Sequence, residues 1–153
     1  MKLKLLLLVS LLIVTCFAAG PSLAGSPEKE KEFTDKYKTA FEAKDSATLE
    51  SFLYQKNADP TALEFYKMMI ADGAGNKITK IELIELSPED AKKAEGTQDG
   101  PGGTKMRLPL KPTKKLKITV EANSANGGSS TASEAFIAEK DGKFVIPVPV
   151  PVK

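Results

Sequence analysis

The sequence predicts an α+β domain, in which N-terminal helices pack on a mainly antiparallel sheet of about five strands. Three observations lead to this fold class. Apolar residues recur at helical spacing in the first half of the chain, and they alternate with polar residues over 114–150. Asp141 and Gly142 separate the last two alternating runs, and such a pair is the strongest short signal for a β-hairpin.

The N-terminal segment has the pattern of a secretory signal peptide. Two lysines precede an apolar run over 5–14, and a small-x-small cleavage site ends at Ala24. The apolar run is shorter than the roughly 20 residues that span a bilayer. We therefore expect cleavage near Ala24 and a secreted or periplasmic protein. Lipoprotein processing with Cys16 acylated is the alternative, although Thr15 stands where Gly or Ala is usual.

Cleavage at this site would leave residues 25–153 as a single α+β domain. The whole chain has 22 Lys and Arg against 20 Asp and Glu, and the loss of two N-terminal lysines makes the domain neutral. A neutral domain lacks the positive charge that nucleic-acid binding requires. The one cysteine, Cys16, would also be lost. The domain must therefore be stable through packing, without disulfides.

The first predicted helix begins at Ser26 and Pro27, which suit the N-cap and first-turn positions. Its aromatic residues Phe33, Tyr37 and Phe41 recur at every fourth position and so share one face. This face is expected to pack on the sheet.

Two further helices are predicted in the same half of the chain. Asp45 suits the N-cap of a short helix, and Asp59 followed by proline suits the start of a longer one. Tyr66 belongs to the apolar stripe of the longer helix, and Gly73 stands where a helix C-terminus is expected.

The remaining segments alternate between strands, loops and one short helix. Leu83 and Ile84 interrupt the alternation of the first strand, which indicates a bulge or a strand covered on both faces. Ser87 predicts the start of the short helix, which ends near Gly96. The predicted strands are 78–86, 106–110, 114–122, 131–140 and 143–150, and the predicted loops are 98–104 and 123–130.

Three prolines fall in or beside the last predicted strand, at Pro147, Pro149 and Pro151. Proline cannot donate a ladder hydrogen bond, and residues of one parity direct their N–H groups to the same side. The pattern predicts an edge strand whose outer side is blocked against another chain. A polyproline segment on the surface is the alternative.

The sequence lacks the residues on which most catalytic and metal sites depend. It contains no histidine, which is the commonest general base and metal ligand. It also contains no phosphate-binding loop, Gly-x-Ser-x-Gly motif or calcium loop. Carboxylate pairs such as Glu82 and Glu85 occur, but their spacing is that of ordinary solvated charge. An enzyme is therefore the less favoured class.

Two tyrosines and the single arginine are the candidates for a binding site. Tyr37 and Tyr66 lie in aromatic stripes, where they either pack in the core or line a pocket. Arg107 is either a surface charge beside a buried Met106 or a clamp for an anion, because arginine binds carboxylates in a fork that lysine cannot mimic.

The order of elements, together with the run from Tyr37 to Asp45 and the following Leu49, Phe52 and Leu53, resembles the NTF2-like, cystatin-like superfamily. The resemblance implies a curved sheet that wraps around the first helix and forms a cone-shaped pocket. Its enzymatic members use Asp, Tyr or His in this pocket, and none of their catalytic patterns matches this chain. The resemblance implies an exported member without a known activity.

We therefore expect an exported, non-enzymatic domain that binds a small apolar or amphipathic ligand between helix and sheet. Candidate ligand-binding residues are Tyr37, Phe41, Tyr66 and Arg107. The alternatives are an interaction domain for a cell-envelope protein and, less favoured, an isomerase or hydrolase with a buried carboxylate near a tyrosine. We expect no cofactor, no metal, no nucleic-acid partner and no membrane span after processing.

Overall fold

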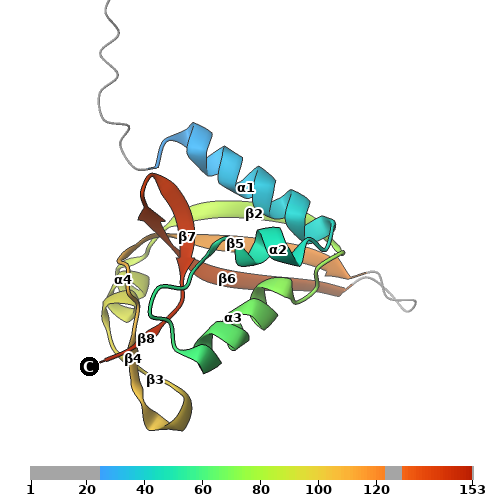
Figure 1. Cartoon of the computed structure of the whole chain (residues 1–153). Coiled ribbons are helices and arrows are strands. Elements are labelled where there is room, and N and C mark those ends of the chain that lie inside the picture. The colour runs from blue at the N-terminus through green and yellow to red at the C-terminus, as the bar shows by residue number, and fades with distance from the viewer. Residues whose placement is uncertain (1–24, 123–128, 153) are drawn as a thin grey trace, which may run out of the picture.

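The computed structural model describes residues 25–122 and 129–152. The predicted signal peptide, Cys16 and most of the predicted loop over 123–130 lie outside the described residues. The described part contains helices α1 to α4, a five-stranded sheet and a three-stranded sheet, which confirms the predicted α+β class (Figure 1).

Each helix begins where the sequence predicts, because a capping side chain accepts a hydrogen bond from the first turn. Ser26, Asp45, Asp59 and Ser87 are these caps, and proline opens three of the four helices. The helices are α1 (Pro27–Glu42), α2 (Ser46–Glu50), α3 (Pro60–Ala71) and α4 (Pro88–Glu95).

The larger sheet has the strand order β1-β7-β6-β5-β2, and its pairs are antiparallel except for the parallel pair of β1 with β7. Its strands are β1 (Leu53–Tyr54), β2 (Lys77–Glu85), β5 (Pro112–Ala122), β6 (Ser129–Lys140) and β7 (Lys143–Pro147). The smaller sheet has the order β3-β4-β8, with β3 (Gln98–Asp99), β4 (Lys105–Arg107) and β8 (Val150–Pro151).

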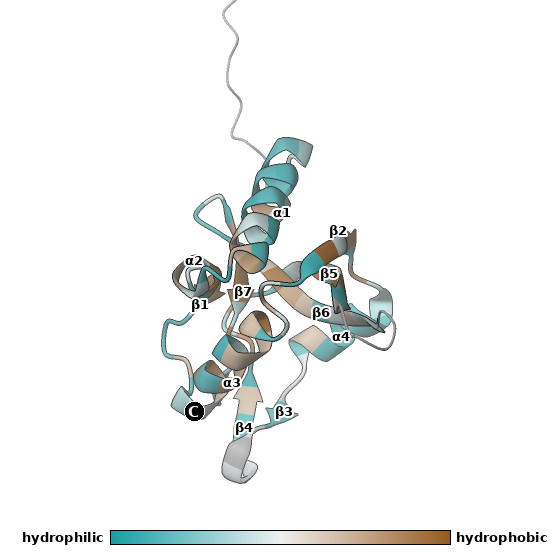
Figure 2. Cartoon of the chain, turned by 90° about the vertical axis from the view of Figure 1, so that its right-hand side faces the viewer, coloured by the Kyte–Doolittle hydropathy of each residue, from teal (hydrophilic) through white to brown (hydrophobic). Residues whose placement is uncertain are grey.

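Helices α1, α2 and α3 lie on one side of the long strands, and α4 lies on the other side (Figures 1 and 2). Most of α1 is coloured hydrophilic in Figure 2, because only one of its faces packs inward. The core between the three helices and the larger sheet contains side chains that are almost fully buried, including those of Phe41, Leu49, Ile137, Ile146 and Val148.

The hairpin between β6 and β7 confirms the prediction from Asp141 and Gly142. Both residues have positive φ, at 51° and 72°. A type I′ turn requires this conformation at both central positions, and its twist matches that of the strands it joins.

The prediction of one continuous edge strand over 143–150 is wrong. The chain divides into β7, which lies inside the larger sheet between β6 and β1, and β8, which pairs with β4 of the smaller sheet. The N–H groups of Ile146 and Val148 donate to the carbonyls of Phe52 and Tyr54 at 2.8 and 3.2 Å. β1 therefore covers the side that the prediction left open.

Pro147 lies on the side of β7 that is opposite to β1. Because even-numbered N–H groups of β7 face β1, the nitrogen of Pro147 faces β6. The ladder between β6 and β7 ends at the pair of Ala138 with Val145. Pro147 has no N–H group that could extend it.

Three smaller features also bear on the predictions. The bulge of β2 lies between Ile78 and Lys80, whereas Leu83 and Ile84 are both half-buried, in agreement with the alternative of a strand covered on both faces. The predicted loop over 98–104 contains β3 and a 3₁₀ turn, Pro101–Gly103. β4 ends at Arg107, before Pro109 of the predicted strand, because a proline there cannot donate to a ladder.

Candidate functional site

The space between the helices and the sheet is filled around Tyr37. The cavity that remains there has a volume of about 20 Å³, which is room for one water molecule. It is lined by Tyr37, Met69, Ile70, Leu116, Ile118, Ser133, Glu134 and Ala135. The interior has no further volume at this point for an organic ligand.

Tyr37 and Phe41, two of the four candidate residues, meet in this core. Their rings are stacked with centroids 6.3 Å apart, and the rings of Tyr37 and Phe52 lie 5.5 Å apart. Tyr37 is 3% exposed, and this burial raises the pKa of its phenol to about 12. The arrangement is that of close-packed aromatic residues.

Neither Tyr66 nor Arg107 lines the cavity beside Tyr37. Tyr66 is half-buried on α3, where its ring meets that of Phe65 edge to face, and burial raises the pKa of its phenol. Arg107 is exposed at the end of β4, in the smaller sheet, while Met106 beside it is buried. The structure therefore does not gather the four candidate residues into one site.

A larger opening lies between the first half of α1 and the hairpin of β6 and β7, whose turn lies near the start of α1 in Figure 1. This groove has a volume of about 560 Å³, within the range of small-molecule sites. It is lined by Lys29, Glu32, Phe33, Lys36, Ser51, Phe52, Gly142, Lys143, Phe144 and Val145. We call it the α1–β7 groove.

The floor of the α1–β7 groove is aromatic. Phe33 lies at its centre, with its ring edge to face with that of Phe52 at 5.1 Å and that of Phe144 at 5.8 Å. The three residues are 6–7% exposed and belong to the hydrophobic core. The Nζ atom of Lys36 lies 5.8 Å from the centroid of the Phe52 ring, within the range of a cation–π contact.

The rim of the groove is mainly basic. Lys29 and Lys36 come from α1, and Lys143 comes from β7. Lys29 extends across the groove, because a Cβ atom placed on Gly142 would lie 3.4 Å from its Nζ atom. Glu32 is the acidic residue among those that line the groove. Three ammonium groups thus face one carboxylate.

The sequence prediction found only part of this site. It placed Phe33 in the inward stripe of the first helix and Phe144 in the last strand, but it named none of the rim lysines. The local signal was Lys29, Phe33 and Lys36, which stand at i, i+4 and i+7 and therefore share a helix face. The opposite wall comes from the far end of the chain, which no local pattern can reveal.

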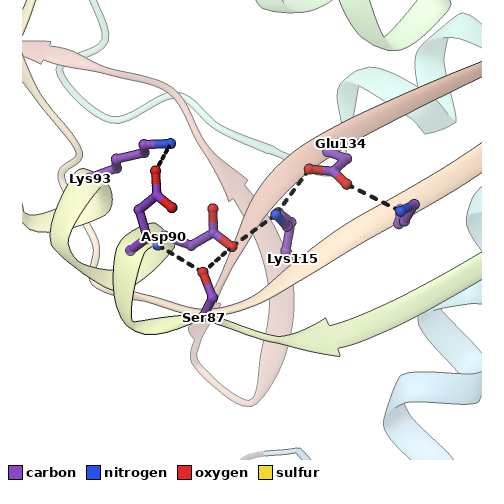
Figure 3. Close-up of polar contacts among 7 residues, drawn as sticks. Ser87, Asp90, Lys93, Lys115 and Glu134 are labelled. Carbon is purple, nitrogen blue, oxygen red and sulfur yellow. Dashed lines mark hydrogen bonds and ion pairs between the residues drawn. The ribbon is translucent and has the colours of Figure 1, made fainter.

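A second polar cluster lies on the other side of the sheet and has a structural role (Figure 3). Lys115 of β5 binds Asp90 of α4 at 2.9 Å and Glu134 of β6 at 2.9 Å. Asp90 also accepts a hydrogen bond from the hydroxyl of Ser87, the cap of α4. These contacts hold α4 against the sheet. Each of the three charged groups has a partner of opposite charge.

The described residues form neither a metal-binding cluster nor a buried carboxylate. Over 25–122 and 129–152, no group of three or more His, Cys, Asp or Glu could hold a metal ion, and no polar or charged residue is buried. A carboxylate desolvated beside a tyrosine, which the enzymatic alternative needs, is therefore not found in this part of the chain. None of the helices described is long and apolar enough to cross a membrane.

Comparison with known proteins identifies no family. No protein-family model matches the sequence, and no curated protein matches it. A solved structure with distant similarity is that of the helical cell shape determining protein Pgp2 from Campylobacter jejuni, with a TM-score of 0.38 and 12% identity. The similarity covers 75% of this chain and 37% of that chain, and at this TM-score we draw no conclusion from it.

Proposed function

We propose that this protein is an exported, non-enzymatic domain that binds a small amphipathic ligand in the α1–β7 groove. The observation that carries the proposal is the contrast in volume between the groove, at about 560 Å³, and the cavity beside Tyr37, at about 20 Å³. The proposed site lies between helix and sheet, as the sequence predicts. It lies beside the first half of α1 and not around Tyr37.

The groove has both properties that an amphipathic ligand needs. Phe33, Phe52 and Phe144 provide apolar area, and burial of apolar area is the main favourable term in such binding. Lysine side chains line the groove beside these rings. Such side chains can keep their stems on apolar surface while their ammonium groups stay in water.

We also propose that the domain belongs to the NTF2-like superfamily and that cleavage near Ala24 releases it outside the cytoplasm. The order of elements and the strand order β1-β7-β6-β5-β2 support the first proposal. The N-terminal sequence pattern supports the second. The mass of the protein purified from the exported fraction tests the cleavage site, and acylation of Cys16 would appear as the mass of an attached lipid.

Binding of the neutral fluorescent probe N-phenyl-1-naphthylamine to the purified protein tests the groove. In the test variant Ser51→Trp, a large side chain fills the groove from an exposed position that lines it. The control is Ser46→Trp, an equal change at an exposed position outside the groove, at the start of the helix α2 of which Ser51 is the C-cap. We expect saturable binding that S51W weakens by about ten-fold, equivalent to about 1.4 kcal/mol, and that S46W leaves unchanged. Absence of saturable binding, or equal effects of the two variants, would overturn the proposal.

A second candidate function is an interaction with a cell-envelope protein through α3. Phe65 and Met68 stand one helical turn apart on this helix and are 55% and 65% exposed. Exposed large apolar residues that adjoin each other mark protein contacts more often than scattered ones do. A photo-crosslinking residue at position 65 should give one defined product in envelope extract, whereas the same group at exposed position 131 should give none.

A further inference from the structure

We propose that the ligand of the α1–β7 groove is a single-chain amphiphile with an anionic head group, of the fatty-acid type. This inference rests on the proposed binding function and adds the chemical class of the ligand. Three features of the groove carry it: the excess of positive charge on its rim, the spacing of that charge along α1, and the packing of its aromatic floor.

The groove is positively charged within a domain that the composition makes neutral. Lys29, Lys36 and Lys143 against Glu32 leave a net charge of +2 at the rim. None of these three lysines forms an ion pair with another described residue. By contrast, Lys31 and Lys38 on the same helix pair with Asp35 and Glu42. On α1, the two lysines outside the groove are thus paired within the protein, whereas the two at the groove have no ion-pair partner among the described residues.

The arrangement along α1 matches an amphiphile with its head at the rim. Lys29 and Lys36 are seven residues apart, which is about 10 Å along a helix axis, and Phe33 lies between them on the same face. Lys143 approaches from the opposite wall. A carboxylate at the rim can therefore contact ammonium groups from both walls while its alkyl chain lies on Phe33, Phe52 and Phe144.

The charge of the rim favours a monoanion over a polyanion. A net charge of +2 is small for a polyanion, whose binding needs many phosphate contacts. The floor, where Phe33 meets two aromatic neighbours edge to face, offers apolar contact to a flexible chain.

Competition between three amphiphiles of equal chain length tests the charge of the head group. Dodecanoate, dodecyl maltoside and dodecyltrimethylammonium, each below its critical micelle concentration, are titrated against bound N-phenyl-1-naphthylamine. We expect dodecanoate to bind at least about ten-fold more tightly than the other two. We expect this preference to decrease as salt is raised, because rim charges are exposed to solvent.

The double variant Lys36→Gln and Lys143→Gln should remove the preference for dodecanoate over dodecyl maltoside. The control is the double variant Lys31→Gln and Lys38→Gln, which changes the net charge equally but lies outside the groove. Equal affinity for the three amphiphiles, or equal effects of the two double variants, would overturn the anionic class. The proposed groove would survive that result, because its own test is the neutral probe with S51W.

Discussion

Lys114 and Lys115 are neighbours in β5, yet their ammonium groups bind helices on opposite faces of the sheet. Lys114 pairs with Glu30 of α1 at 3.0 Å, and Lys115 pairs with Asp90 of α4 at 2.9 Å. Successive strand residues point to opposite faces, so the two lysines connect the two layers that cover the sheet. Both side chains are largely covered, at 13% and 15% exposed.

The two lysines should therefore have separable effects on local stability. Lys115→Met removes the partner of Asp90, and we expect faster amide hydrogen exchange at Ala91 and Ala94 in α4, because local opening of that helix becomes easier. Lys114→Met should instead increase exchange near the start of α1. Each variant is the control for the other. Identical exchange profiles for the two would contradict the assignment of one lysine to each layer.

The contacts of Asp90 also predict a dependence of stability on acid. The hydrogen bond from Lys115, followed by that from Ser87, lowers the pKa of Asp90 below its ordinary value. A carboxyl group with a lowered pKa in the folded state stabilises it above the ordinary pKa near 4, and this contribution is lost as the pH falls through the lowered value.

At pH 6, the urea midpoint of unfolding should therefore be higher for the wild-type protein than for the variant Asp90→Asn. This difference between the two midpoints should decrease toward pH 2.5. Unfolding curves at these two pH values, followed by circular dichroism, measure it. A difference that is the same at both pH values would show that the ionised form of Asp90 is not the form that stabilises α4.

Helix starts were predictable because their causes are local. Each of Ser26, Asp45, Asp59 and Ser87 accepts a bond from an amide three residues later, and sequence alone shows such spacing. The turn at Asp141 was predictable for the same reason, since positive φ restricts which residues can occupy it.

The position of the last strand in the sheet was not predictable, because it depends on a partner that is distant in the sequence. The position of β7 inside the sheet follows from two carbonyl groups, those of Phe52 and Tyr54, which are separated from Ile146 by most of the chain. β1 has two residues and no alternation of its own. The α1–β7 groove was missed for the same physical reason, since its second wall exists only after β7 has docked.

Phe41 should be among the residues most sensitive to truncation. Its side chain is fully buried, and Phe41→Ala should lower the free energy of unfolding by about 3–5 kcal/mol, because it removes apolar contacts and leaves a cavity. Phe65→Ala is the matched control, since 55% exposure predicts a change within about 0.5 kcal/mol. Chemical denaturation measures both, and similar losses in the two variants would contradict the position of Phe41 in the core.

Tyr37 should make the protein less stable in strong base. Burial raises the pKa of its phenol to about 12, whereas a tyrosine in the unfolded chain ionises near pH 10. Between these values the unfolded chain releases a proton that the folded protein retains, so stability falls as the pH rises. The contribution of the protonated Tyr37 phenol to the free energy of unfolding is fully present below pH 10. At pH 12 about 2–3 kcal/mol of this contribution has been lost.

The variant Tyr37→Phe keeps the ring and removes the ionising group, so it isolates this effect. We expect the free energy of unfolding of wild type relative to Y37F to decrease by about 2–3 kcal/mol between pH 9 and pH 12. The effect of burial on Tyr66 is common to both proteins and cancels in the comparison. A wild-type advantage that stayed constant over this range would mean that water reaches the Tyr37 hydroxyl in the folded protein. The aromatic core beside α1 would then be open to solvent, and the cavity beside Tyr37 would again become a candidate for the binding site.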